Sequence, residues 1–413
     1  MIARDVSLLL AGDALIARAW SQVGDAAFLG LIDTIRAADV AIANLETVIH
    51  EFKGHAQADA GGVYMASPPL IAAELKWAGF NMLAHANNHA FDYGASGVLE
   101  TIQHVEGEGL MIAGSGRDLQ QARAPRYLHC NGSTVALVAT ASDFVQYGRA
   151  SYSRPEVPGR PGINPLATRH RQIKMMPLRA GAHLGNFVSR LCGMPVATSS
   201  FPRLEVVFTW GRRVEPSDLT ANLEAISEAA SNAHIVVASI HAHRQGSWLA
   251  TVARQAIDRG AHVVLVHGPH QIRGVELYRG RPIFYSLGDF VFESEYVTRL
   301  PAEAYQRVGL PPDAPLEALR ASNHKHMSGL LQDREAFESM VAMMLFANGS
   351  PSRIRLLPID LNFGAKDGSR GRPQLASPEV GKRIIEVVER RSRRFRTRIH
   401  YDPAENVGEV ILG

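Results

Sequence analysis

The first 140 residues alternate short apolar runs with stretches of helical period, and this alternation limits the chain to few folds. Residues 6–11 and 40–43 predict strands. Residues 28–38 between them predict a helix, because their apolar side chains recur at a spacing near 3.6. Strands that alternate with helices in this way are typical of a sheet covered by helices. We therefore expect an α/β fold.

The same rhythm continues along the chain. Further strands are expected at 81–84, 110–113, 134–139, 204–208, 235–240, 262–266, 339–345 and 353–358, and further helices at 69–78, 96–106, 217–233, 251–259 and 378–391. Two β-hairpins are expected, at the Asn131-Gly132 pair and at the turn that begins with Arg279.

Two segments interrupt this pattern. Residues 143–200 are rich in proline and glycine and predict a long excursion over the site, and residues 293–335 predict a second irregular insertion. We expect a core over residues 1–292 that carries the first insertion. Residues 336–413 are expected to complete the same domain with strands and a helix.

Charge and cysteine content argue against several classes of protein. Lys and Arg total 43 against 40 Asp and Glu, a balance that does not favour a nucleic-acid partner. Two cysteines cannot form a disulfide framework or a thiolate metal site. No apolar run reaches the roughly 18 residues of a membrane span, and no leader with a cleavage site is recognisable. We expect a cytoplasmic protein with no membrane partner.

Polar residues follow the predicted strands at the points where the strands end. They are Gly12-Asp13, Asn44-Leu45-Glu46, His85-Ala86-Asn87-Asn88-His89, His241-Ala242-His243, His267-Gly268-Pro269-His270 and Gly288-Asp289. Ligands bind at the carboxyl ends of strands in open α/β sheets, so these groups predict one shared site.

The chemistry of these side chains allows two uses. Imidazole together with carboxylate suits one or two ions of zinc, manganese or iron, which would clamp an attacking hydroxide and a leaving oxygen. Without metal, the same groups are a general acid and a general base. Two arginines follow the histidine pairs and are candidates for binding an anionic group, namely Arg244 and Arg273. Asp92 is expected to cap the helix that begins near Ala95.

The order of these motifs, with Asp92-Tyr93-Gly94 and Ser286-Leu287-Gly288-Asp289-Phe290, resembles the CapA-type family of poly-γ-glutamate capsule biosynthesis proteins over residues 6 to 292. That family belongs to the calcineurin-like metallophosphatase fold. The resemblance implies a four-layer α/β-β/α sandwich with long loop insertions and a site at the sheet ends. Two positions depart from the family pattern, since Asp13-Ala14-Leu15 lacks the histidine of Asp-x-His and Asp289 stands where asparagine is usual.

The resemblance also implies roles for the motif residues. The positions that match the metal centre of the family are Asp13, Glu46, Asn88, His89, His241, His267 and His270. The expected catalytic residues are Asp13, His89, His241, His267 and His270, and the expected substrate-binding residues are Asn44, Asn87, His243, Arg244 and Arg273.

Three functions remain open at this point. The favoured one is an enzyme that acts on a peptide or poly-γ-glutamate backbone by metal-assisted hydrolysis. The second is a peptide epimerase that needs neither metal nor cofactor, because some family members in lasso-peptide gene clusters resemble such epimerases. It would use Asp13 and one of the late histidines as acid and base. The third is a non-catalytic protein that binds a peptide or polyglutamate.

Overall fold

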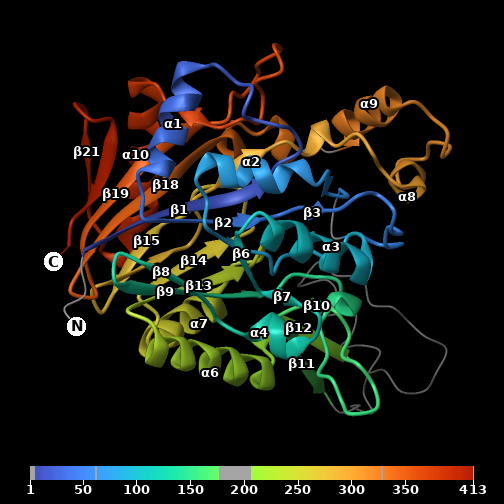
Figure 1. Ribbon diagram of the computed structural model, residues 1–413, viewed down its shortest axis with the longest axis horizontal. Coiled ribbons are helices and arrows are strands. Elements are labelled where there is room, and N and C mark those ends of the chain that lie inside the picture. Colours follow the sequence, from blue (N-terminus) through green and yellow to red (C-terminus); the bar gives the residue numbers. More distant parts are fainter. Residues whose placement is uncertain (1–4, 61–62, 176–205, 327–328, 413) are drawn as a thin grey trace, which may run out of the picture.

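The computed structural model describes residues 5–60, 63–175, 206–326 and 329–412 (Figure 1). Its two large sheets are built mostly from the predicted apolar runs. The first has the order β21-β22-β19-β18-β1-β2-β5-β6, and the second has the order β15-β16-β14-β13-β9-β8. The prediction of an α/β fold is confirmed.

The first sheet is mixed. It contains β1 (Val6–Leu15), β2 (Val40–Leu45), β5 (Met82–Ala84), β6 (Met111–Ala113), β17 (Asp289–Phe292), β18 (Glu338–Ala347), β19 (Ser350–Asp360), β20 (Gln374–Leu375), β21 (Ile399–Asp402) and β22 (Val407–Val410). β1 pairs in parallel with β2 and β17 and antiparallel with β18. The strands β2, β5 and β6 continue the sheet in parallel, so their carboxyl ends meet at one edge.

The second sheet has a parallel centre flanked by two hairpins. It contains β8 (Arg126–Cys130), β9 (Ser133–Ala141), β13 (Ile235–His241), β14 (Val263–His267), β15 (Val275–Tyr278) and β16 (Arg281–Phe284). Both predicted hairpins are confirmed, β8–β9 and β15–β16. Asn131 and Gly132 have positive φ values of 48° and 76°, which is the backbone of the tight turns that join twisted hairpin strands.

The two sheets pack face to face because successive side chains of a strand point to opposite sides. Leu8 and Leu10 of β1 share a buried cluster with Leu137 of β9 and Leu265 of β14. Leu9, on the other face of β1, packs against the helices α1 (Ala26–Arg36), α2 (Leu70–Ala78) and α3 (Gly94–Gly107). The first sheet is therefore buried on both sides at β1.

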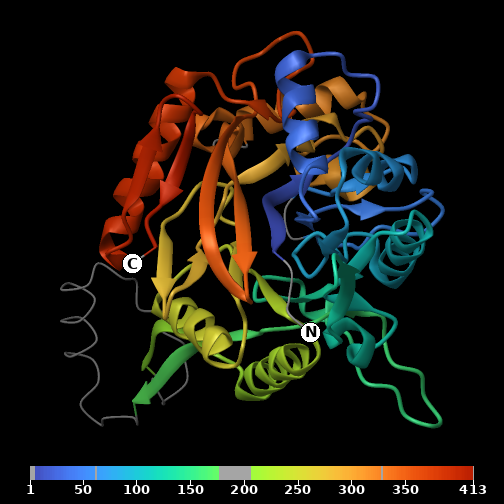
Figure 2. The same ribbon diagram turned by 60° about the vertical axis from the view of Figure 1, so that its left-hand side comes forward.

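The outer face of the second sheet is covered in the same way. Ala136 and Ala238 pack against the helices α6 (Pro216–Asn232) and α7 (Ser247–Asp258). A further helix, α10 (Pro378–Ser392), packs Ile384 and Val388 against the core between the sheets (Figure 2). The molecule is thus layered as helices, sheet, sheet and helices (Figure 1).

Short strand pairs and helices complete the described residues. They are β3 (Val48–Ile49) with β4 (Ala66–Ser67), β7 (Ser115–Gly116) with β10 (Gly162–Ile163), β11 (Thr168–Met175) with β12 (Val206–Val214), and the helices α4 (Leu119–Arg123), α8 (Ala302–Gln306) and α9 (Leu316–His326). None of the helices in the described ranges is long and apolar enough to cross a membrane.

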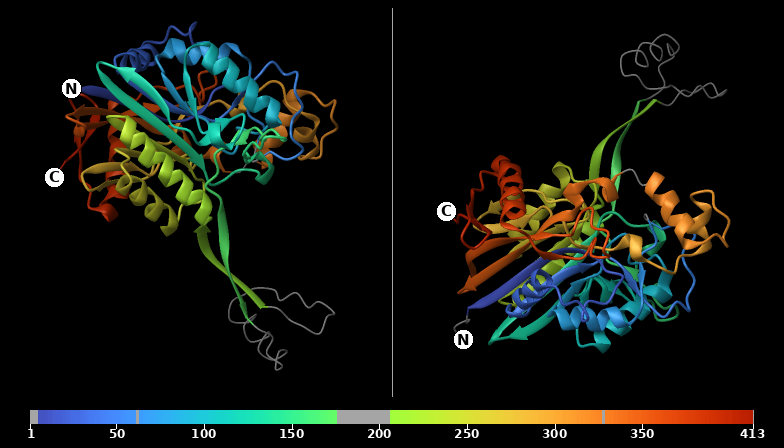
Figure 3. Two further views of the ribbon diagram at one scale, coloured as in Figure 1. Left: turned by 60° about the horizontal axis from the view of Figure 1, so that its bottom comes forward. Right: turned by 90° about the horizontal axis from the view of Figure 1, so that it is seen from above.

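The structure of the two predicted insertions differs from what the sequence led us to expect. Within 143–200, β11 is a strand that pairs antiparallel with β12, which follows the predicted insertion, and the two form a ribbon that projects from the layered body (Figure 3). Residues 176–205 lie outside the described residues. The segment 293–335 contains α8 and α9 instead of being irregular throughout. The helix α9 was not predicted because Leu316–His326 is dominated by polar residues and has few apolar positions.

The backbone of β1 closely approaches the loop before β17. A Cβ atom placed on Gly12 would lie 1.8 Å from the carbonyl oxygen of Gly288, so only glycine fits. Gly288 itself has a φ of 83°, a conformation that favours glycine. This contact brings Asp13 of β1 beside Asp289 of β17 in the parallel register.

Candidate functional site

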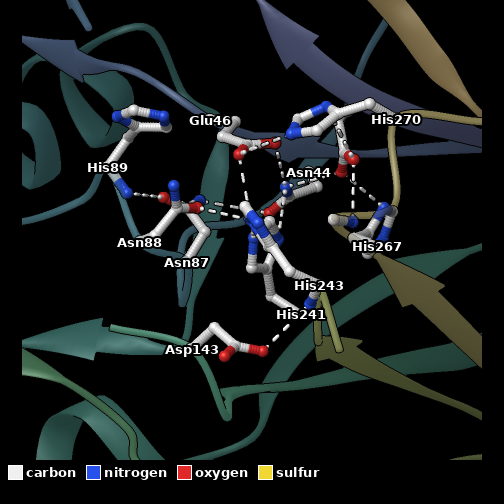
Figure 4. Close-up of polar contacts among 12 residues, drawn as sticks. Asn44, Glu46, Asn87, Asn88, His89, Asp143, His241, His243, His267 and His270 are labelled. Carbon is white, nitrogen blue, oxygen red and sulfur yellow. Dashed lines mark hydrogen bonds and ion pairs between the residues drawn. The ribbon is translucent and has the colours of Figure 1, made fainter. Parts of the chain in front are cut away.

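The polar ends of the strands meet between the two sheets (Figure 4). Asp13 lies in β1, Asn44 lies in β2, and Glu46 follows β2. His241 and His267 end β13 and β14 of the second sheet, where they are register partners. Each of these five side chains is buried, so their charges and hydrogen bonds act in a site shielded from water.

Asp13 connects the two sheets. Its Oδ1 accepts a hydrogen bond of 2.8 Å from the side-chain amide of Asn44 and lies 3.0 Å from Nδ1 of His267. Its Oδ2 accepts from the backbone N–H of Gly268 at 2.9 Å. Burial opposes ionisation, but the hydrogen bond from His267 and the nearby imidazoles hold the pKa of Asp13 well below its usual range.

His267 is oriented by this contact. With Nδ1 directed at the Asp13 carboxylate, its Nε2 is buried and has no hydrogen-bond partner among the described residues. An imidazole held in this way at one nitrogen has the other available to exchange a proton.

His270 forms a second imidazole–carboxylate pair. Its Nδ1 lies 2.8 Å from Oδ1 of Asp289, and its Nε2 lies 3.9 Å from Oε1 of Glu46. Burial opposes the charge, yet Asp289 and Glu46 raise the pKa of His270 to about 10. Burial raises the pKa of Asp289 to about 6. At neutral pH we therefore expect His270 to carry a positive charge.

A third group contains Glu46, Asn88, His241 and His243. The Nε2 atoms of the two histidines are 2.9 Å apart. Oδ1 of Asn88 lies 3.2 Å from Nε2 of His243, and Oε1 of Glu46 lies 3.7 Å from Nε2 of His241. Burial lowers the pKa of both imidazoles, that of His243 to about 4, so both are neutral and keep a lone pair.

This third group fits a divalent metal ion. Oε1 of Glu46 is buried without a hydrogen-bond partner among the described residues, although it lies near two imidazole nitrogens. Ligand atoms of a tetrahedral site with bonds of about 2.1 Å lie about 3.4 Å apart, close to the separations in this group. Two nitrogens and two oxygens suit zinc, manganese or iron.

A second candidate set, Asp13, Glu46 and His270, is geometrically compact but less suited to a metal. Both oxygens of Asp13 already accept hydrogen bonds, and the positive charge expected on His270 at neutral pH leaves its ring without a lone pair for a metal. The histidine of the Asp-x-His pattern is replaced by Leu15, which is buried and apolar.

Comparison with known proteins identifies the family. Residues 7–294 match the family model described as "Bacterial capsule synthesis protein PGA_cap". The chain belongs to the PGA_cap family. The match covers the strands that carry every polar group described above, and it confirms the resemblance to CapA-type proteins.

Relatives of this PGA_cap member carry several descriptions. It is 31% identical to the uncharacterized protein y4uA of Sinorhizobium fredii, over 98% of this chain and 93% of that protein. It is 25% identical to the PGA biosynthesis protein CapA of Bacillus subtilis, over 70% of this chain and 63% of that protein. It is 24% identical to the probable polyglutamine synthesis accessory protein Rv0574c of Mycobacterium tuberculosis, over 91% of this chain and 78% of that protein.

Asn87, an expected substrate-binding residue of this PGA_cap chain, supports the loop after β5. The side-chain amide of Asn87 donates to the backbone oxygen of Leu45 at 2.8 Å and to Oδ1 of Asn44 at 3.2 Å. Its own oxygen accepts from the backbone N–H groups of His89 and Ala90. Asn87 therefore ties this loop to the end of β2.

His89 is placed apart from the other histidines of the site. Its Nδ1 lies 2.8 Å from Oδ2 of Asp92, and its ring points away from the pair formed by His241 and His243 (Figure 4). The expectation that Asp92 caps a helix is wrong. Its carboxylate also accepts from the backbone N–H of Met65, whereas α3 begins after Tyr93 without a side-chain cap.

The two arginines expected to bind substrate are not brought into the polar cluster. Arg244 is exposed, and its backbone N–H approaches Asp143. Arg273 is partly buried, and burial lowers its pKa. The nearby charges that act on it are Arg391 of α10, Arg394 just after α10, and Glu335, which pairs with Arg391. The role assigned to each arginine stays a prediction.

Sequence reasoning placed Asp289 in the shared site without a specific role, and it did not include Asp143. Asp143 follows β9, and its Oδ2 accepts from the backbone N–H of His243 at 3.0 Å. Its Oδ1 lies 3.4 Å from Arg212 at the base of the projecting ribbon. Asp143 stands after an apolar run, which is the signal that identified Asp289 and the other site residues.

Replacing Asp143 with alanine tests whether it positions His243. We expect the affinity for zinc to fall about tenfold, because the His243 backbone loses its hydrogen bond and the imidazole loses its fixed orientation. Isothermal titration with zinc measures the change. Asp118→Ala is the matched control, since Asp118 accepts from a backbone N–H at the start of α4. Equal zinc affinity in both variants and the unchanged protein would contradict this role.

Proposed function

We propose that this protein hydrolyses an amide bond of a peptide or poly-γ-glutamate chain with the help of one divalent metal ion. Glu46, Asn88, His241 and His243 would hold the ion. The observation that carries the proposal is the set of ligand atoms 2.9–3.7 Å from one another along this group, with Oε1 of Glu46 otherwise unpartnered among the described residues. We further propose that the four layers are those of the calcineurin-like metallophosphatase fold.

When bound, a metal ion at this place supplies a Lewis acid that polarises a carbonyl and makes water more acidic. The residues of the chain manage the protons. Nε2 of His267, aligned by Asp13, accepts a proton from the water whose oxygen adds to the carbonyl carbon. The same proton then passes to the leaving nitrogen as the carbon–nitrogen bond breaks. The positive charge of His270 stabilises the negative charge that develops on the carbonyl oxygen.

The choice of substrate is supported by the names of relatives. The family is described by capsule synthesis, and the Bacillus subtilis relative by PGA biosynthesis. We carry this over to the present chain as the proposal that an amide between glutamate residues is the bond attacked.

A metal-free peptide epimerase is a second candidate, and one observation favours it. The structure contains two imidazole–carboxylate pairs, Asp13–His267 and Asp289–His270, which lie in one buried cluster. An epimerase needs a base that removes the α-proton and an acid that returns a proton to the opposite face. In this reaction His267 would be the base and His270 the acid.

Metal removal distinguishes the candidates. For hydrolysis we expect about one zinc, manganese or iron ion per chain by elemental mass spectrometry. Dialysis against a chelator should abolish cleavage of γ-linked and α-linked glutamyl peptides, and adding the ion back should restore it. A folded, metal-free protein that exchanges peptide α-protons in deuterated water would overturn hydrolysis in favour of epimerisation. Peptide binding without either reaction would indicate a binding protein.

A further inference from the structure

A groove of about 570 Å³ lies outside the polar cluster, between segments that follow the strands of the site. Arg18 follows β1, Phe52 follows β3, and Tyr296 and Arg299 follow β17. Arg320 of α9 completes the wall. The segment that carries α8 and α9 lies beside the loops after β3 (Figures 1 and 3). The groove is therefore built by the chain as it leaves the site.

Two arginines of this groove, Arg299 and Arg320, have no carboxylate ion-pair partner among the described residues. The guanidinium of Arg299 is exposed and stacks over the ring of Phe52 at 4.8 Å. Nε of Arg320 donates to the backbone oxygen of Glu295 at 3.1 Å. Among the described residues, no carboxylate forms an ion pair with either one. Stacking and the backbone hydrogen bond instead hold the two guanidinium groups in place.

The other charged groups in the lining are neutralised. Arg18 pairs with the buried carboxylate of Glu293 and donates to two backbone oxygens of the loop at Gly368. Glu51, the acidic residue that lines the groove, is ion-paired with Lys53. The net charge available to a ligand is therefore positive.

The remaining surface of the groove is apolar. Phe52, Pro68, Pro69 and Val297 contribute to its lining. A ligand that places carboxylates against guanidinium groups and a carbon chain against these side chains would be complementary to both features.

We infer that this groove binds the carboxylates of a glutamate-rich segment of peptide, and that Arg299 and Arg320 are the residues that recognise them. The inference rests on the proposed function, because it supplies that reaction with a subsite for the part of the substrate beyond the bond attacked. Planar guanidinium groups match the two oxygens of a carboxylate, and the methylene groups of a glutamate side chain match the apolar wall.

The test measures the binding of a fluorescently labelled oligo-γ-glutamate to the full-length protein. Fluorescence anisotropy is recorded directly after mixing, before any cleavage. We expect Arg299→Gln and Arg320→Gln each to raise Kd about tenfold, the usual loss for one charge-assisted hydrogen bond. Arg117→Gln is the matched control, since Arg117 is also exposed and is without a carboxylate partner in the part of the chain that the structure describes. It should leave Kd unchanged.

Two further measurements make the result independent of any one variant. The amidated analogue, oligo-γ-glutamine, should bind at least tenfold more weakly to the unchanged protein, and raising the salt concentration should weaken oligo-γ-glutamate. Equal binding of the two oligomers, or equal losses in Arg117→Gln and Arg299→Gln, would overturn the inference.

The outcomes for this groove and for the reaction are separable. If the unchanged protein binds oligo-γ-glutamate through these arginines but cleaves nothing, the proposed hydrolysis fails and the subsite stands. If the protein cleaves glutamyl peptides and both variants keep the KM of the unchanged protein, the subsite fails and the hydrolysis stands.

Discussion

Replacing Glu46 with glutamine should abolish metal binding while leaving the fold intact. Glutamine keeps the size of the side chain but removes the one negative charge from the proposed ligand group. We expect the affinity for zinc to fall at least about 100-fold, more than the tenfold to 100-fold loss typical of residues that only support metal ligands. Hydrolysis of glutamyl peptides should fall with it.

The metal-free Glu46→Gln variant should be at least as stable as the unchanged protein, although it binds metal more weakly. Burial raises the pKa of Glu46 well above its ordinary value, and the nearby charge of Asp13 adds to the effect, so the metal-free fold disfavours the ionised form. The neutral amide removes this penalty. The urea midpoint of the metal-free variant should therefore equal or exceed that of the unchanged protein.

Glu276→Gln is the matched control for these measurements. Glu276 is also a buried glutamate, but it pairs with Arg254 and accepts from the hydroxyl of Tyr285 in the second sheet. We expect this variant to lose stability and to keep its metal. Full zinc content in Glu46→Gln would contradict the assignment of Glu46 as a ligand.

Replacing Gly12 with alanine should destabilise the protein by more than about 3 kcal/mol. The added Cβ would stand 1.8 Å from the backbone oxygen of Gly288, and a backbone atom in the middle of a packed sheet cannot move aside. β1 and β17 would have to separate, although their pairing places Asp13 beside Asp289. The free energy of unfolding in urea measures the effect.

Gly107→Ala is the control for the glycine substitution. A Cβ on Gly107, the last residue of α3, would meet no atom within 4 Å, and alanine favours helix by up to about 1 kcal/mol over glycine. We expect unchanged or slightly higher stability. A loss below about 1 kcal/mol in Gly12→Ala would show that β1 and β17 tolerate separation.

Much of the layered core was predictable from the sequence because it depends on local patterns. Apolar runs such as 235–240 became β13, and the Asn131-Gly132 pair formed its hairpin. Strand ends were harder to locate. β1 continues through Asp13 to Leu15 because its register shifts beside β2 and it gains β17 as a second partner, and neither effect is local.

The candidate site was predictable as a set of residues but not as a set of pairs. Its members stand at strand ends, and parallel strands bring their ends together. Which carboxylate faces which imidazole depends on contacts between segments far apart in the chain. Asp289 pairs with a histidine that adopts a φ of 54°, a left-handed conformation that a sequence pattern does not predict for this residue type. Contacts between distant segments also place Arg273 near the charges around α10 and not in the polar cluster.

The contacts of Asp13 make the alignment of the two sheets measurable in engineered forms of the protein. One carboxylate on the first sheet accepts hydrogen bonds from its own sheet through Asn44 and from the second sheet through Gly268, and it faces His267 there. A slip of either sheet by about 1 Å would stretch the bonds to Gly268 and His267 beyond useful length. The contact between Nδ1 of His267 and the Asp13 carboxylate, followed by NMR of the imidazole, is thus a gauge of sheet alignment. If one sheet were exchanged for that of a homologue, a misalignment of the two sheets should change the signal of this imidazole before any secondary structure is lost.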